Sequence, residues 1–131
     1  RQHLVEKVLP VLKEDGIVIC DRFIDSSLVY QGIGRGIGVD NIYNMNLFAT
    51  DGILPDLTIF FDVKPEVALK RITGDREVNR LDLESLDFHH KVYVGYQMIC
   101  DKFPDRIVKV DASLPVDEVY HQVYEIVKDR L

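Results

Sequence analysis

Residues 17–32 read IVICDRFIDSSLVYQG and decide the fold class that we expect for this chain. Residues 17–20 form a short continuous apolar run without alternation, which is typical of a strand buried on both faces of a parallel sheet. Asp21 and Arg22 follow where that strand would end. In open α/β sheets ligands bind beyond the carboxyl ends of the strands, so this pair is a candidate phosphate and metal site.

The pattern on either side of this stretch predicts an α/β fold. Residues 57–63 and 107–110 are further short runs rich in β-branched residues, which favours two more buried strands. Apolar residues at helical spacing predict helices at residues 4–12, 25–31, 40–52, 65–72, 86–103 and 115–127. Strands that alternate with helices imply right-handed parallel crossovers, hence a parallel sheet with helices on both faces and one domain over residues 1–131.

Several local signals refine the helix boundaries. Pro10 should bend the first helix, because proline lacks the backbone N–H that a helix needs. Asp25, Ser26 and Ser27 offer side-chain caps for the second helix, and Asp40 offers one for the third. The first helical run begins at Arg1 without a capping residue before it, so we expect the chain to begin inside a helix.

Composition excludes several classes of protein. With 16 basic against 22 acidic residues the net charge is -6, which argues against binding of nucleic acid or an anionic membrane through bulk charge. Cys20 and Cys100 lie in apolar runs, which predicts small buried side chains rather than a disulfide or a zinc site. The four histidines show no metal-ligand spacing. No apolar run approaches the roughly 20 residues of a membrane span, so we expect a cytoplasmic protein.

The run from Asp21 to Gly36 is far more specific than its first dipeptide, which alone would suit a polar strand end with a local salt bridge. It resembles the signature of the thymidylate kinase family, and the similarity extends to RQHL at residues 1–4, LPDLT at 54–58, RLD at 80–82 and FH at 88–89. The resemblance implies a fold of the P-loop nucleoside monophosphate kinase type. The chain contains no Gly-x-x-x-x-Gly-Lys-Ser/Thr, so we expect an incomplete, C-terminal part of a single such domain.

The resemblance also implies a sheet order. The family arranges five strands as 2-3-1-4-5, and the three expected here correspond to strands 3, 4 and 5. Residues 17–20 and 57–63 should then lie about two strand spacings apart, roughly 10 Å, without direct pairing.

Roles at the phosphate end follow from the same resemblance. Arg22 is similar to the arginine that binds the phosphate of the nucleoside monophosphate, and Asp21 to its Mg²⁺-associated partner, which acts through water. Phe23 stands where the family commonly has tyrosine, so one hydroxyl is lost.

Three residues on the following helix resemble the binding site for the nucleoside. Ser27 and Gln31 lie one turn apart, where they can meet a pyrimidine edge. Tyr30 is similar to the aromatic residue that crowds the sugar 2′ position and favours deoxyribose. Each has a structural alternative: Ser27 as a cap, Tyr30 as core packing and Gln31 as solvated surface.

The glycines from Gly32 to Gly38 suggest a dinucleotide fingerprint only superficially. That fingerprint needs glycines directly after a strand, whereas these follow a helical segment, which favours a substrate-side loop or a simple turn.

The resemblance implies that residues 73–82 are a lid over the transferring phosphoryl group. Arg76 and Arg80 are the expected lid arginines, in preference to Arg71; the alternative is a solvated, charged helix end. Asp111, Ala112 and Ser113 follow the third strand, and in the family this loop packs against the adenine of ATP.

The implied activity is transfer of the γ-phosphoryl group of ATP to thymidine 5′-monophosphate (dTMP), with Mg²⁺, giving dTDP and ADP. We expect the 131 residues alone to be inactive. The family is typically a homodimer formed through helices, so the apolar stripe of residues 4–12 is a candidate interface, although core burial explains it equally well. A kinase for another monophosphate and a non-catalytic nucleotide-binding or dimerisation fragment are the alternatives.

Overall fold

The computed structural model describes residues 1–73 and 80–130, with the backbone alone at residues 73 and 80–85. The chain separates into two compact units, Arg1–Leu54 and Pro55–Leu131, each described below by itself. That the 131 residues form one domain therefore stays a prediction.

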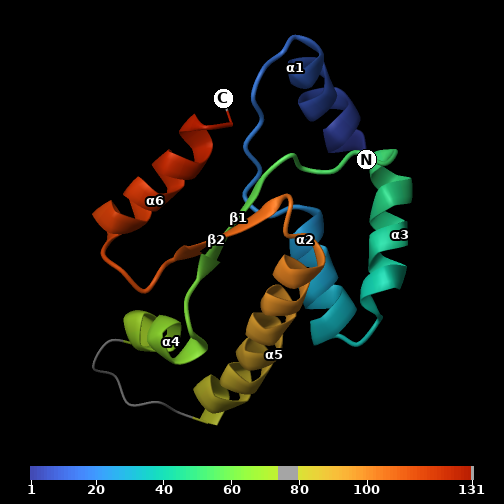
Figure 1. Ribbon diagram of the computed structural model, residues 1–131. Coiled ribbons are helices and arrows are strands. Elements are labelled where there is room, and N and C mark those ends of the chain that lie inside the picture. Colours follow the sequence, from blue (N-terminus) through green and yellow to red (C-terminus); the bar gives the residue numbers. More distant parts are fainter. Residues whose placement is uncertain (74–79, 131) are drawn as a thin grey trace. The chain divides into compact units, whose positions relative to one another are not determined.

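The first unit contains helical segments joined by irregular stretches (Figure 1). In chain order they are η1 (Leu4–Val8), α1 (Leu9–Lys13), α2 (Ile24–Ser27), η2 (Leu28–Gly34) and α3 (Val39–Thr50), where η marks a π-helix. The buried apolar side chains of this unit lie on η1, α2, η2 and α3: Leu4, Val8, Ile24, Leu28, Val29 and Ile42. The helices predicted in this part of the sequence are therefore present.

Pro10 explains the wide turn at the start of the chain. It has no N–H to donate to the carbonyl of Glu6, so a regular α-helical ladder cannot run through this point. The N–H of Leu9 instead donates to the carbonyl of Leu4, five residues back, as in a π-helix. The bend predicted at Pro10 takes this form, a wide turn next to the proline.

The prediction of a buried strand at residues 17–20 is wrong. These residues have no regular secondary structure, and the side chains of Ile17 and Ile19 are 65% and 92% exposed. An apolar run becomes a strand only when its backbone pairs with a neighbour, and among the described residues this run has no ladder partner. Cys20, expected to be buried, is exposed for the same reason, whereas Cys100 is buried as predicted.

The capping predictions are also wrong. Phe23 and Gly38 occupy the positions before α2 and α3, and neither helix has a side-chain cap. Ser26 lies inside α2, where its hydroxyl accepts a hydrogen bond from Arg22. Asp40 lies in the first turn of α3, two positions after the N-cap position, which Gly38 occupies.

The glycine-rich stretch is a tight turn between η2 and α3. The N–H of Gly38 donates to the carbonyl of Gly32 at 2.9 Å. A Cβ on Gly32 would come within 3.1 Å of the Cα of Val39, so glycine permits this close approach. Gly38 has a φ of +98°, a conformation that favours glycine. The turn follows a helix rather than a strand, as the sequence predicted.

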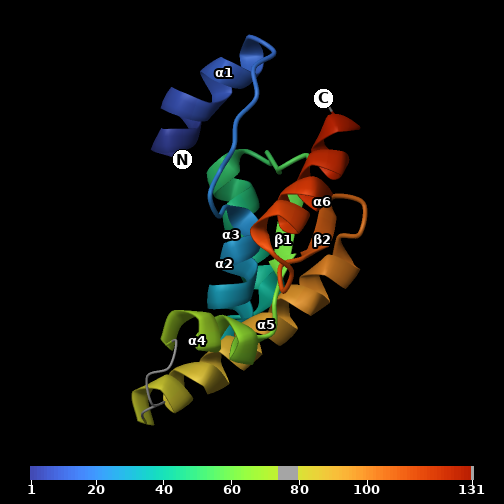
Figure 2. The ribbon, with the colours of Figure 1, turned by 90° about the vertical axis from the view of Figure 1, so that its left-hand side faces the viewer.

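In its described residues, 55–73 and 80–130, the second unit has two parallel strands and three helices. The strands are β1 (Thr58–Asp62) and β2 (Ile107–Asp111), paired from Thr58 with Ile107 to Asp62 with Asp111. The helices are α4 (Pro65–Thr73), α5 (Arg80–Lys102) and α6 (Val116–Lys128). Figure 1 shows the strands between α5 and α6, and in Figure 2 α6 lies in front of them. The two strands predicted at residues 57–63 and 107–110 are confirmed.

The core of this unit lies on β2 and the face of α5 turned toward it. Ile107 and Val110 on β2 are buried together with Val92, Ile99 and Cys100 on α5. Phe60 on β1 stacks on Tyr96 of α5 with ring centroids 4.7 Å apart, which orients the strand against that helix. The observed architecture is a two-stranded parallel sheet with helices, as in an incomplete α/β fold. Because residues 17–20 belong to the other unit and form no strand, their predicted distance from β1 stays a prediction.

Candidate functional site

The segment that leads into α2 places Arg22 in an unusual backbone conformation. Arg22 has a φ of +67°, in the left-handed region that residues with a Cβ rarely adopt. Phe23 then returns to φ -142°, and α2 begins at Ile24. A left-handed conformation costs an ordinary residue roughly 1–2 kcal/mol, and such residues persist where neighbouring contacts hold them.

Two contacts with the following helix hold the Arg22 side chain. Its Nε donates a hydrogen bond to the Oγ of Ser26 at 2.8 Å. The guanidinium carbon lies 4.4 Å from the centroid of the Tyr30 ring, in a cation–π contact. Arg22 is exposed and makes no ion pair with a residue of the part that the structure describes. The guanidinium is therefore oriented while its two terminal nitrogens stay available.

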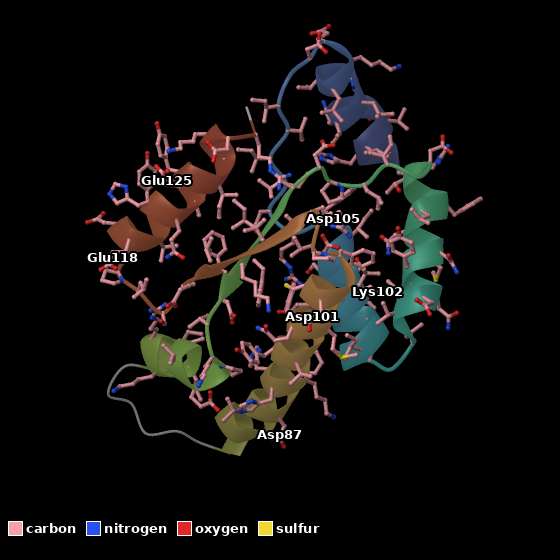
Figure 3. All side chains as sticks on the ribbon, viewed as in Figure 1. Asp87, Asp101, Lys102, Asp105, Glu118 and Glu125 are labelled. Carbon is pink, nitrogen blue, oxygen red and sulfur yellow. The ribbon has the colours of Figure 1, made fainter. Side chains whose placement is uncertain are left out.

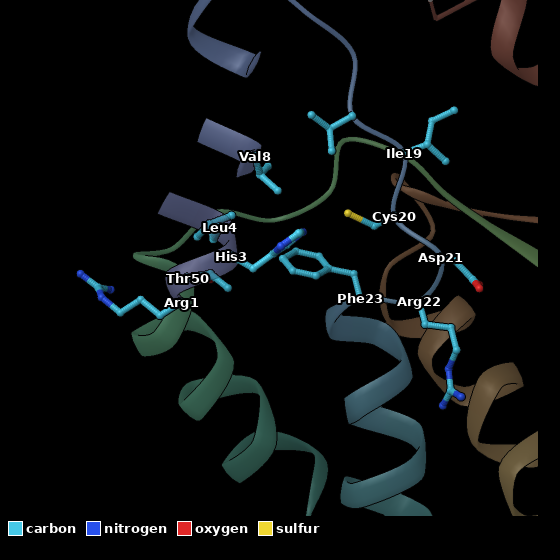
Figure 4. A pocket seen from close by; sticks show the side chains of 11 residues that line it. Arg1, His3, Leu4, Val8, Ile19, Cys20, Asp21, Arg22, Phe23 and Thr50 are labelled. Carbon is cyan, nitrogen blue, oxygen red and sulfur yellow. The ribbon is translucent and has the colours of Figure 1, made fainter. Parts of the chain in front are cut away.

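Asp21, Arg22 and Phe23 line one side of a cavity of about 340 Å³ within the first unit. The remaining lining comes from residues of η1 and its start, from residues 18–20 and from Thr50. Figure 4 shows that the side chains of Asp21 and Arg22 point away from those of His3 and Phe23. The predicted phosphate-end residues thus lie together at the rim of the cavity, with their charged groups directed outward.

The predicted nucleoside contacts lie at the end of α2 and on η2, the wider helix that follows it. Ser27 ends α2 and is half-buried, and Gln31 lies exposed in η2. The N–H of Arg35 donates to the carbonyl of Tyr30, five residues back, so the turn is wider than the α-helical turn on which the prediction relied. Neither Ser27, Tyr30 nor Gln31 lines the cavity of the first unit. Their roles in binding a nucleoside stay predictions.

The loop predicted to meet adenine is tightly ordered in the second unit. The Oδ1 of Asp111 accepts hydrogen bonds from the Ser113 hydroxyl at 2.5 Å and the Ser113 N–H at 2.9 Å. These bonds, the hydroxyl first, lower the pKa of the Asp111 carboxyl. Gln122 of α6 contacts the same residue through its side-chain amide, accepting from the Asp111 N–H at 2.9 Å.

Arg71 connects α4 to this loop. Its Nη1 donates to the carbonyl of Ala112 at 2.7 Å and its Nη2 to the carbonyl of Ser113 at 2.8 Å. Both terminal nitrogens are thereby engaged with backbone. Sequence reasoning considered Arg71 only as a lid residue and missed this contact, because nothing in the local pattern relates residue 71 to residues more than 40 positions later.

A polar network at the end of β1 was also missed. Asp62 accepts a hydrogen bond from the Nε2 of Gln97 at 3.2 Å, and the Nζ of Lys109 donates to the Oε1 of Gln97 at 2.6 Å. Desolvation raises the pKa of Tyr93, and the charge of Asp62 and a hydrogen bond to it act in the same direction. The sequence offered one signal for this network. Tyr93 and Gln97 are four positions apart, so they share one face of α5, and that face could meet the acidic residue that ends β1.

Among the residues whose side chains the structure describes, 1–72 and 86–130, no cluster of three or more His, Cys, Asp or Glu side chains could hold a metal. The acidic side chains labelled in Figure 3 are exposed and spread apart: Asp87 and Asp101 lie on α5, Asp105 lies between α5 and β2, and Glu118 and Glu125 lie on α6. Asp21 is a single exposed carboxylate. That donor set suits Mg²⁺, which keeps several waters and uses one or two carboxylates together with substrate phosphates.

The predicted lid falls largely outside the described residues. Arg76 lies outside them altogether, and for Arg80 the structure gives only its backbone position at the start of α5. The lid at residues 73–82 stays a prediction.

Among the described residues, no helix has the combination of length and apolar character needed to cross a bilayer.

Comparison with known proteins gives consistent matches. The sequence model of the thymidylate kinase family matches residues 1–123. The thymidylate kinase of Clostridium novyi (strain NT) is 57% identical over 130 residues, which cover 98% of this chain and 63% of that protein. Those of Geobacillus sp. (strain WCH70) and Bacillus cereus (strain ATCC 14579) are each 53% identical over 133 residues, covering all of this chain. The chain spans 63–64% of the length of these relatives.

Proposed function

Because the chain belongs to the thymidylate kinase family, we propose that its natural protein transfers the γ-phosphoryl group of ATP to dTMP, giving dTDP and ADP. The observation that supports this most directly is the state of Arg22. An exposed arginine whose side chain is oriented, but whose terminal nitrogens are not used within the protein, can bind a phosphate through two N–H groups.

The acceptor requires alignment rather than activation. The phosphate of dTMP is already anionic at neutral pH, so no general base is needed, and positioning with neutralisation of charge accounts for catalysis. Arg22 would hold that phosphate. Asp21 would hold Mg²⁺ through water, and the ion would neutralise charge on the transferring phosphoryl group. Ser27, Tyr30 and Gln31 would contact the nucleoside.

The ordered loop of the second unit would contact the adenine of ATP. Its shape is fixed by the hydrogen bonds of Asp111 and Ser113 and by the contacts from Arg71 and Gln122. A loop that is already ordered loses little conformational entropy when a flat base packs against it. Arg76 and Arg80 would complete the site from the lid, and the homodimer is part of the same proposal.

The test is a panel of acceptors with the full-length natural protein. ADP release from ATP and Mg²⁺ would be followed in a coupled assay with dTMP, dCMP, dGMP and UMP at equal concentrations. We expect kcat/KM to be highest for dTMP. A preference for any other monophosphate, or the absence of ADP release with all four, would contradict the proposal.

A further inference from the structure

Arg22 is held by two residues of the adjoining helix, one of which has no role in the proposed function. Residues 22, 26 and 30 succeed one another at intervals of four, so that Ser26 and Tyr30 both face the side chain of Arg22. Ser26 is itself buried, with 9% of its surface exposed, so its hydroxyl is fixed in place.

The two contacts occupy different parts of the guanidinium. A guanidinium carries five N–H groups, one on Nε and two on each terminal nitrogen. Ser26 takes the Nε–H at 2.8 Å, and the Tyr30 ring covers one flat face at 4.4 Å. The edge formed by Nε and one terminal nitrogen is therefore closed to a phosphate, whereas the edge formed by Nη1 and Nη2 stays open.

Resting on the proposed function, we propose that Ser26 and Tyr30 are positioning residues that present Arg22 to the dTMP phosphate through its Nη1–Nη2 edge. Arg22 makes both contacts from a left-handed backbone conformation, with a φ of +67°, that residues with a Cβ rarely adopt. A free arginine loses substantial side-chain entropy when it binds an anion, and a guanidinium that is already held loses less.

A second arginine provides a control for ring stacking. The guanidinium carbon of Arg106 lies 4.6 Å from the centroid of the Phe103 ring, a geometry close to that of Arg22 on Tyr30. Arg106 precedes β2 and has no role in the proposed site. The Nη1 of Arg106 donates to the Oγ1 of Thr58 at 3.5 Å, whereas Arg22 donates from Nε, so two arginines that both stack on a ring differ in which donors are engaged.

The experiment compares Ser26→Ala with Ser26→Thr, which keeps a hydroxyl, in the full-length natural protein. We expect Ser26→Ala to raise KM for dTMP about five- to tenfold, because an Arg22 that is no longer held loses more side-chain entropy when it binds the phosphate, with a smaller change in kcat and in KM for ATP. Ser26→Thr should restore most of the loss. Tyr30→Leu should raise KM for dTMP more than Tyr30→Phe, because Phe keeps the aromatic face.

A double-mutant cycle separates positioning from a general structural effect. On an Arg22→Ala background, Ser26→Ala should change KM for dTMP less than twofold, because the side chain that it positions is gone. An equal loss on both backgrounds, or an unchanged KM in Ser26→Ala alone, would overturn the proposal.

The Nε–H of Arg22 gives a readout that does not depend on activity. Its ¹⁵N-detected signal should exchange slowly with water in the wild-type protein and several-fold faster in Ser26→Ala, without any nucleotide present. Fast exchange in the wild-type protein would overturn the positioning proposal even if dTMP is the substrate. Slow exchange in a protein that does not phosphorylate dTMP would instead overturn the proposed function and leave the contact standing.

Discussion

Arg22 in the first unit and Arg71 in the second show opposite uses of the same side chain. Arg71 donates from both terminal nitrogens to backbone carbonyls of residues 112 and 113. Arg22 donates only from Nε, to Ser26. Arg71 is thus part of the framework of a loop, whereas Arg22 is held in place with its two terminal nitrogens available. Which donors are already engaged, rather than exposure or charge, distinguishes an arginine that stabilises a loop from one that can bind a phosphate.

The largest effect on activity should come from removing Arg22, whose terminal nitrogens are available. We expect Arg22→Ala to lower kcat/KM for dTMP about 10²–10³-fold, the range seen when one donor to a developing oxyanion is lost. Arg106→Ala is the matched control, since it also removes a guanidinium stacked on a ring, and it should change kcat/KM less than threefold. Steady-state kinetics of the two variants decide the comparison, and a similar loss in both would remove the distinction.

Removing Arg71 should act in the first place on the stability of the protein rather than on catalysis. Arg71→Ala breaks two charge-assisted hydrogen bonds, each worth about 1.5–3 kcal/mol when buried. Because Arg71 is exposed, we discount this and expect a loss of about 1–2 kcal/mol in the free energy of unfolding. Urea denaturation measures it, with Arg71→Lys, which can keep one bond, as the intermediate case.

The kinetic result of Arg71→Ala sharpens the contrast with Arg22. If the loop meets adenine, KM for ATP should rise several-fold while KM for dTMP changes little at saturating ATP. A variant with unchanged stability would show that the two carbonyl contacts do not hold the loop. A larger effect on dTMP than on ATP would place Arg71 in the acceptor site instead.

The strained backbone at Arg22 predicts a smaller difference. Arg22→Gly and Arg22→Ala both remove the side chain, but only glycine accepts a φ of +67° without a steric penalty. We expect the glycine variant to be more stable than the alanine variant by about 0.5–1 kcal/mol, after allowing for the greater freedom of glycine in the unfolded chain. Thermal and urea denaturation of the pair measure this, and equal stabilities would show that the conformation is unstrained.

The same comparison shows what the sequence could predict. The strands β1 and β2 and the helix α6 were readable because each carries its own hydrophobic pattern, and on β2 the side chains of Ile107 and Val110 are buried. Residues 17–20 have an equally clear pattern, yet they form no strand, because pairing with a neighbour is a property that the pattern does not contain. A hydrophobic run therefore predicts a strand correctly only where a neighbouring strand is there to pair with it.

The sequence predicted which residues belong to the candidate site but not the contacts that hold them. Asp21 and Arg22 were found from their place after an apolar run and from a family resemblance. Arg22 contacts Ser26 from a left-handed conformation, which no propensity would assign to an arginine. The contact of Arg71 with residues 112 and 113 joins segments far apart in the chain, so it follows from the packing of α4 beside the end of β2 and not from local sequence.

The smallest effect concerns the carboxyl group that orders the loop held by Arg71. Hydrogen bonds from Ser113 lower the pKa of Asp111 in the folded protein, so the charged form contributes stability above the unfolded pKa, and that contribution is lost as the pH falls through the folded value. Ser113→Ala should therefore raise the Asp111 pKa toward its ordinary value, whereas Ser113→Thr should leave it low. NMR titration of the carboxyl carbon measures the shift directly. The stability difference between Ser113→Ala and the wild-type protein should narrow as the pH falls from neutral into the range where this carboxyl titrates; a difference that stays constant across that range would mean that the hydroxyl acts on the loop by a route other than the Asp111 charge.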